Sequence, residues 1–258
     1  MKQVQRNGLH LWEFDNFAEE PGVRHFVTGR NTQQSSNGEF TLSLSSTPDK
    51  ERVIRNRKAL AEAMQVPDTR LFFPSQVHGT RIVHVTSRTQ KEELLEADAL
   101  ITAEAGACIA VMSADCVPVL LYDRKNHVVA AVHSGWRGTV AHILQKTLHT
   151  LREKFGSQGH DIIAGIGPSV SQASYQVGEE VVREVRGAFG KADQLLIAEA
   201  DNKARLDLWK ANEFQLLDFG VPLKQIEVSD LCTVKNNDHF FSARKGDAGR
   251  FAAGIMLV

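Results

Sequence analysis

Short apolar runs bounded by polar or turn residues recur along most of the chain. Their length and their β-branched residues favour strands over helices. The runs cover residues 71–73, 81–86, 108–112, 117–122, 128–132, 161–166, 225–231 and 251–257. The sequence therefore predicts a strand at each of these places.

Other segments carry apolar residues at helical spacing. The sequence TPD at 47–49 supplies an N-cap, a first-turn proline and a first-turn acid for a helix over 48–65. Another apolar stripe follows Gly138, runs over 140–155 and ends near Gly156. Further helices are expected over 178–188 and 206–219.

These elements do not alternate strictly as strand and helix. We therefore expect an α/β or α+β fold, in which mixed sheets are layered with helices. Residues 30–46 are small and polar, which indicates a loop. We find no internal repeat or linker, and 258 residues suit one large domain, so a single domain over residues 1–258 is expected.

Charge and composition exclude several classes of protein. The chain has 30 Lys and Arg against 31 Asp and Glu, a net charge of −1, whereas a general nucleic-acid binder needs a basic surplus. No apolar run reaches the roughly 18 residues of a spanning helix, and the N-terminus lacks the apolar core of a secretory signal. Three cysteines are too few for a disulfide framework. We expect a soluble, cytoplasmic protein that binds neither nucleic acid nor a membrane.

Residues that can bind a metal occur where predicted strands end. His78 lies in QVHG between two runs, Cys116 lies in SADCVPV between two more, and His133 follows the 128–132 run. Two imidazoles and a thiolate with a fourth position open are typical of a catalytic zinc site. In the competing interpretation, Cys116 is a buried small hydrophobe and both histidines satisfy backbone groups. Spacing alone favours the second interpretation.

Several polar neighbours could support chemistry there. Arg137 lies in a glycine-bracketed loop before a helix, where it could share an anion with the helix end or simply pack on the adjacent tryptophan. Arg244 is a second cationic candidate, although solvated charge is the commoner fate of such residues. Asp115 could orient a ligand or accept a proton, and in a strand its side chain would point away from Cys116.

Two residues near His78 invite simpler interpretations. Gln76 could hold the His78 loop by an amide contact or touch a substrate. His84 shares a strand face with Ile82, so we expect a half-buried histidine and not a fourth metal ligand.

A set of longer segments carries a resemblance to a known family. The segments are QVHG, ADALIT, SADCVPVLLYD, AAVHSGWRGT, GIGPSV, YQVGEEV, LDLWKANEFQLL and FFSARKGDAGRFA. In this order they resemble the motifs of the YfiH family, also called the laccase-domain or multicopper polyphenol oxidase family. The matching segments run from about Phe73 to the C-terminus, which is most of the chain.

This resemblance implies a compact α/β sandwich with a zinc centre at His78, Cys116 and His133. It implies phosphorolysis of adenosine, inosine and methylthioadenosine, together with deamination of adenosine, so the expected partners are a purine nucleoside and phosphate. Older descriptions of the family name a copper-dependent polyphenol oxidase, and bacterial members are linked to peptidoglycan editing.

The chain departs from the family pattern at three places. Ala173-Ser174 stand where a cysteine pair is often found, and Val234-Lys235 occupy a stretch that often holds another cysteine. The N-terminal family motif survives only as Gly29-Arg30 and Leu42-Ser43-Leu44. The three metal-ligand candidates match the family, and Arg30 is carried over as a substrate-binding candidate.

Our main expectation is a zinc-dependent purine nucleoside phosphorylase with deaminase activity, and three alternatives remain open. A multicopper oxidase needs more ligands than one His, Cys, His site, and none of the ten histidines forms a His-x-His pair, although a single copper could bind. A cysteine hydrolase would use Cys116 as nucleophile with His133 or His78 as base. A non-catalytic partner protein would order its 30–46 loop on binding.

Overall fold

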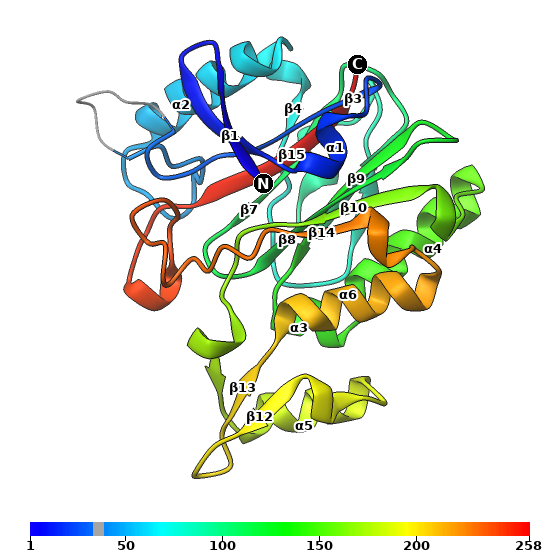
Figure 1. The fold of residues 1–258 in the computed structure, drawn as a ribbon. Coiled ribbons are helices and arrows are strands. Elements are labelled where there is room, and N and C mark those ends of the chain that lie inside the picture. The colour runs from blue at the N-terminus through cyan, green and yellow to red at the C-terminus, as the bar shows by residue number, and fades with distance from the viewer. Residues whose placement is uncertain (33–38) are drawn as a thin grey trace.

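Two six-stranded mixed sheets form the centre of the molecule (Figure 1). The computed structural model describes residues 1–32 and 39–258. The first sheet has the order β1, β2, β3, β15, β7, β4, with bounds Lys2–Arg6, Leu9–Glu13, Val23–Val27, Phe251–Leu257, Cys108–Ser113 and Leu71–Phe72. The second has the order β14, β10, β8, β9, β6, β5, with bounds Ile226–Val228, Ile162–Ile166, Val117–Asp123, Val128–Ser134, Ala99–Thr102 and Ile82–His84.

The inner strands β7, β8, β9, β10 and β15 are apolar at nearly every position because both of their faces are covered. One core lies between the sheets, where Ile109 and Ile255 of the first sheet join the same cluster as Leu120 and Val129 of the second. Successive side chains of a strand point to opposite faces, so Val128 belongs to the core on the outer face of the second sheet.

Helices cover both outer faces (Figure 1). The helix α2 (Lys50–Met64) packs Leu60 and Met64 against Cys108 and Ala110 of the first sheet. On the other side, α4 (Ile143–Phe155) and α6 (Leu208–Phe219) share a core with the second sheet. The result is a layered sandwich of helix, sheet, sheet and helix, which confirms the predicted fold class.

Smaller elements complete the fold. A third sheet has the order β11, β13, β12, with bounds Gln176–Val177, Ala204–Leu206 and Leu196–Ala198. It lies beside α5 (Glu179–Ala188) at the bottom of Figure 1. The short helices are α1 (Asp15–Ala18) and α3 (Trp136–Val140). Over residues 1–32 and 39–258, no helix combines the length and the hydropathy needed to cross a membrane.

The structure corrects two local predictions and agrees with a third over its described residues. The helix expected over 140–155 is two helices, because His142 adopts a left-handed conformation (φ +58°) between α3 and α4. The N-cap of α2 is Asp49, not Thr47, since the Asp49 carboxylate accepts a hydrogen bond from the backbone N–H of Arg52 at 2.9 Å. The loop predicted over 30–46 contains no helix or strand at 30–32 and 39–46, and 33–38 lie outside the described residues.

Candidate metal centre and active-site cavity

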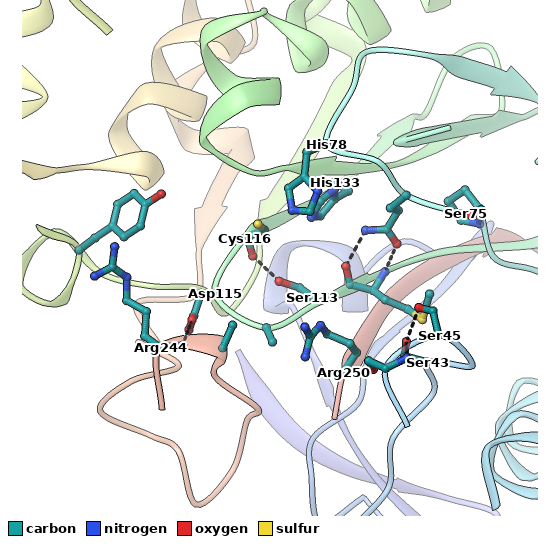
Figure 2. A pocket seen from close by; sticks show the side chains of 17 residues that line it. Ser43, Ser45, Ser75, His78, Ser113, Asp115, Cys116, His133, Arg244 and Arg250 are labelled. Atoms are coloured by element: carbon teal, nitrogen blue, oxygen red, sulfur yellow. Dashed lines mark hydrogen bonds between the residues drawn. The ribbon is translucent and has the colours of Figure 1, made fainter. Parts of the chain in front are cut away.

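Three side chains from distant parts of the sequence meet in one place. His133 is the penultimate residue of β9, Cys116 lies between β7 and β8, and His78 lies in the loop between β4 and β5. One ligand atom from each residue lies within 4.8 Å of the others, and the two imidazole centroids are 4.9 Å apart. Figure 2 shows the three tips gathered together. The structure thus brings together the metal-ligand candidates that the sequence suggested.

The carboxylate of Asp98, a fully buried residue, organises two of these three ligands. It accepts a hydrogen bond from Nδ1 of His133 at 2.8 Å, which leaves Nε2 of that ring for a metal or a substrate. The same carboxylate accepts hydrogen bonds from the backbone N–H groups of Val77, His78 and Gly79 at 3.2, 2.9 and 2.7 Å. Asp98 therefore fixes both the orientation of the His133 ring and the position of the His78 loop.

Cys116 and His133 shift each other's pKa. Burial alone would raise the pKa of the Cys116 thiol, but His133 and then His78 lower it to about 6. Burial alone would lower the pKa of His133, but the Cys116 thiolate and the Asp98 carboxylate raise it to about 9. Cys116 is therefore a thiolate at neutral pH, which is the form that binds metals and attacks electrophiles.

The backbone around the three residues is tightly constrained. His78 has a left-handed conformation (φ +62°), which its backbone hydrogen bond to Asp98 helps to hold. A Cβ placed on Gly135 would lie 2.8 Å from Sγ of Cys116 and 3.0 Å from Cδ2 of His78. Glycine is therefore required at position 135 for the three ligands to converge.

The three residues line a cavity of about 430 Å³. This volume lies in the usual range of small-molecule sites, which is roughly 300–1,000 Å³. Its hydroxyl-bearing and cationic lining residues include Ser43, Ser45, Ser46, Ser75, Ser113, Tyr175, Arg244 and Arg250. In the view of Figure 2, Arg244 lies to the left of the His, Cys, His cluster, whereas Arg250 and Ser75 lie to its right. A potential metal centre and a cavity of small-molecule size therefore share one wall.

Gln76 holds the His78 loop against the first sheet. Its Nε2 donates to the carbonyl of Met112 at 2.8 Å, and its Oε1 accepts a hydrogen bond from the Met112 backbone N–H at 2.8 Å. Both ends of the amide are thus paired with β7, in the way that a neighbouring strand would pair. The amide contact predicted for Gln76 is present, and its side chain also lines the cavity.

Asp115 is not in a strand, contrary to the expectation from sequence. It lies in the turn before β8 with φ +90°, and it is buried. Its carboxylate accepts hydrogen bonds from the hydroxyl of Thr233 at 2.6 Å and from the backbone N–H of Arg244 at 2.8 Å. Asp115 therefore ties the C-terminal segment to the wall of the cavity.

The predicted arginines occupy different places. Arg244 lines the cavity, lies over the Tyr175 ring at 4.6 Å and donates to the carbonyl of Gln176 at 2.8 Å. Arg137 is exposed, lies over the Trp136 ring at 4.3 Å and is absent from the cavity lining. Of the two interpretations given above, packing on the adjacent tryptophan therefore describes its position.

Arg30 is also outside the cavity lining. Its guanidinium pairs with Asp247 at 2.7 Å and with Glu39 at 3.1 Å, and it donates to the carbonyl of Asn237 at 2.6 Å. These contacts make Arg30 a tie between the N-terminal and C-terminal segments. His84 is exposed, not half-buried, and packs edge-on against Phe155 away from the cluster, as expected for a residue that is no fourth ligand.

The donor chemistry of the cluster suits one soft or borderline metal ion. A thiolate and two imidazoles are ligands that zinc prefers, and three protein ligands leave a position for substrate. The Asp98–His133 hydrogen bond supplies the outer support that such histidines usually have. Within the described residues, His78, Cys116 and His133 form the one His, Cys or acidic group with this geometry. Several coppers would need further ligands.

Comparison with known proteins places the chain in a family. The model of the family described as multi-copper polyphenol oxidoreductase laccase matches residues 24–258. The chain belongs to this family. Proteins named YfiH occur among its relatives in sequence and in structure. The resemblance to YfiH motifs is thereby confirmed.

Curated relatives of the laccase-domain chain carry names from purine metabolism. A purine nucleoside phosphorylase of Bacteroides thetaiotaomicron is 40% identical over 257 residues, covering 95% of each chain. The adenosine deaminase RL5 of an unknown prokaryote is 33% identical, covering 96% of this chain and 98% of the relative. Among solved structures, the Bacillus licheniformis hypothetical protein YfiH has a TM-score of 0.89 at 28% identity, covering 98% of this chain and 97% of its own.

Sequence reasoning missed three residues that this site depends on. Asp98 lies in the ADALIT motif but has no special spacing, and its role appears only when three separate segments meet around it. Gly135 was visible as part of HSGWRG, although its contact with Cys116 was not. Arg250 lies in the C-terminal family motif and enters the cavity, where Arg30 and Arg137 do not.

Proposed function

We propose that this protein is a zinc-dependent enzyme of purine nucleosides, with phosphorolysis as its main reaction and deamination of adenosine as a second. The observation that carries the proposal is the convergence of His78, Cys116 and His133 on the wall of a cavity of about 430 Å³. The names of the relatives, which include both a purine nucleoside phosphorylase and an adenosine deaminase, support this substrate class.

Zinc bound to the three residues would act as a Lewis acid that polarises an oxygen of the incoming nucleophile. The chain prepares its ligands before the metal arrives. Cys116 is held as a thiolate by the neighbouring histidines, and Asp98 keeps Nε2 of His133 directed at the cluster. Such prepared ligands lower the cost of assembling the site.

Both reactions need an oxygen nucleophile beside a bound nucleoside. In phosphorolysis, a phosphate oxygen forms a bond to C1′ of the ribose as the C1′–N9 bond breaks. The electron pair of that bond leaves on the purine, and the proton lost by phosphate ends on the purine nitrogen. In deamination, water adds to C6 of adenosine and ammonia leaves. One cavity can serve both reactions because the nucleoside and the polarised oxygen are common to them.

A cysteine hydrolase is the second candidate, and one observation favours it. Asp98, His133 and Cys116 form a chain of contacts like that of a nucleophile, its base and the group that orients the base. A metal-free Cys116 would then attack a carbonyl, for example in a peptidoglycan peptide. Metal content separates the two proposals, because a thiolate bound to zinc is quenched as a nucleophile.

Elemental analysis combined with product chromatography tests the proposal. Purified protein should contain about one zinc per chain and convert adenosine, inosine and methylthioadenosine to free bases only when phosphate is present. His78→Ala should lose both metal and turnover, whereas His84→Ala, a histidine outside the cavity, should keep both. Equal rates for wild type and His78→Ala would refute the assignment, and hydrolysis by a metal-free enzyme would favour the cysteine hydrolase.

A further inference from the structure

The cavity extends to both sides of the His, Cys, His cluster, and the two ends differ chemically. In the view of Figure 2, Arg244 and Asp115 lie to the left of Cys116, whereas Arg250, Ser43 and Ser45 lie to the right. All five residues line the same cavity. A reaction between a nucleoside and phosphate needs two such compartments with the reacting atoms between them.

Arg250 offers an uncompensated positive charge at its end of the cavity. Its Nη1 donates to the carbonyls of Asp247, Ala248 and Gly249 at 3.1, 3.1 and 2.7 Å, which fixes the guanidinium against its own turn. Across residues 1–32 and 39–258, no carboxylate forms an ion pair with Arg250. Arg30, by contrast, is neutralised by Asp247 and Glu39. A planar, half-buried and unpaired guanidinium is suited to a phosphate group.

Serine hydroxyls accompany this charge. Oγ of Ser43 lies 3.2 Å from Oγ of Ser45, and both residues line the cavity together with Ser46 and Ser75. Oγ of Ser46 is buried and has no hydrogen-bond partner among the described residues. A buried hydroxyl without a partner costs free energy, so a ligand that accepts its hydrogen bond is favoured.

The opposite end is less suited to an anion. Arg244 is already engaged with the Tyr175 ring and the carbonyl of Gln176, and the carboxylate of Asp115 lies against its backbone N–H. That carboxylate repels a phosphate, whereas the stacked guanidinium and phenol form a flat surface for an aromatic base.

We propose that Arg250 and the serines around it bind the phosphate co-substrate, and that Tyr175 and Arg244 receive the purine. This inference rests on the proposed function and gives the substrates an orientation across the metal centre. It assigns the anion-binding role that the sequence suggested for Arg137 or Arg244 to Arg250.

Arg250→Gln tests the proposal because deamination of adenosine needs no phosphate. We expect the affinity for inorganic phosphate, measured by isothermal titration of the zinc-loaded protein, to fall about tenfold or more. The KM for phosphate in phosphorolysis should rise by a similar factor, and phosphorolysis should lose more of its rate than phosphate-free deamination does. Arg250→Lys keeps the charge but loses the planar fork, and it should be intermediate.

Two control variants sharpen the experiment. Arg55→Gln removes an exposed charge on α2 and should change nothing, whereas Arg244→Gln should raise the KM for nucleoside and leave that for phosphate unchanged. The inference is overturned if wild type binds no phosphate, if Arg250→Gln binds it as wild type does, or if Arg250→Gln and Arg250→Lys lose deamination as fully as phosphorolysis. Phosphate binding that depends on Arg250 without any nucleoside turnover would overturn the proposed function alone.

Discussion

Asp98 and His133 are joined by a hydrogen bond of 2.8 Å between a carboxylate oxygen and Nδ1, and the same carboxylate holds the backbone that carries His78. Asp98, which is not one of the three candidate ligands, therefore determines where two of them lie. Burial opposes the charge of Asp98, but His133 and the backbone N–H groups hold its pKa below the usual value. Asp98 remains a carboxylate at neutral pH.

Asp98→Asn should weaken metal binding about 10- to 100-fold, the usual effect of losing such a supporting carboxylate. An amide has nearly the same shape, but its NH₂ group cannot accept a hydrogen bond, so it cannot serve both His133 and the loop. Competition with a chelator of known affinity measures the change. A dissociation constant equal to that of wild type would show that Asp98 does not organise the ligands.

Gly135→Ala should abolish or strongly reduce metal occupancy while leaving most of the fold intact. The backbone of Gly135 (φ −70°, ψ 171°) suits alanine, so the damage comes from the new Cβ meeting Sγ of Cys116. Gly178→Ala is a matched control, because its backbone is also extended and a Cβ there meets nothing within 4 Å. Elemental analysis and thermal melting of the two variants should therefore differ, and full occupancy in Gly135→Ala would contradict the geometry.

Gln76→Ala should loosen the His78 loop. The substitution leaves the N–H and the carbonyl of Met112 without their partner, at a cost of about 1–3 kcal/mol in the free energy of unfolding. Metal affinity should fall with it, because His78 loses one of its two anchors. Denaturant unfolding and metal titration provide the measurements, and an effect on neither would mean that Asp98 alone holds the loop.

His25 should make the protein less stable in acid. Burial, and next the charge of Arg6, lower its pKa to about 3, and its Nε2 accepts a hydrogen bond from the backbone N–H of Phe14 in the neutral form. In the unfolded chain the imidazole binds a proton near the ordinary histidine pKa of 6.5, so this stabilisation is complete above that pH. It is lost at about 1.4 kcal/mol per pH unit as the pH falls towards 3.

His25→Gln keeps an acceptor for Phe14 but cannot titrate in this range. The variant should therefore show a shallower loss of stability than wild type between pH 6 and pH 4, both measured by denaturant unfolding. Parallel curves for the two proteins would show that His25 is not protonated on unfolding.

The sequence predicted the central strands well because they are buried on both faces and read as uninterrupted apolar runs. β8 and β9 were placed with nearly the observed bounds for this reason. β1, β2, β3 and β6 were not predicted. β2 buries Leu9, Leu11 and Glu13 in alternation, and the polar residues between them conceal the pattern. Glu13 is buried because it pairs with Arg6, a contact that no local pattern reveals.

The site also contains residues that the sequence could predict and residues that it could not. His78, Cys116 and His133 could be named as candidates from their residue types and their places at strand ends, but only the resemblance to the YfiH family favoured a metal site over buried structural residues. The roles of the arginines could not be predicted, because the same side chain stacks on Trp136 at position 137, forms ion pairs at position 30 and enters the cavity at position 250. Only the tertiary neighbours distinguish these outcomes.

Each candidate metal ligand lies where the polypeptide crosses from one sheet to the other or near the end of a strand. His78 lies in the connection from β4 in the first sheet to β5 in the second, and Cys116 lies in the connection from β7 to β8. His133 is the penultimate residue of β9, shortly before α3 begins. A bound ion would thus cross-link the edges of the two sheets. Because the ion binds only the folded chain, metal loading should raise the melting temperature of the whole domain. The same ion would then supply both the proposed chemistry and thermal stability.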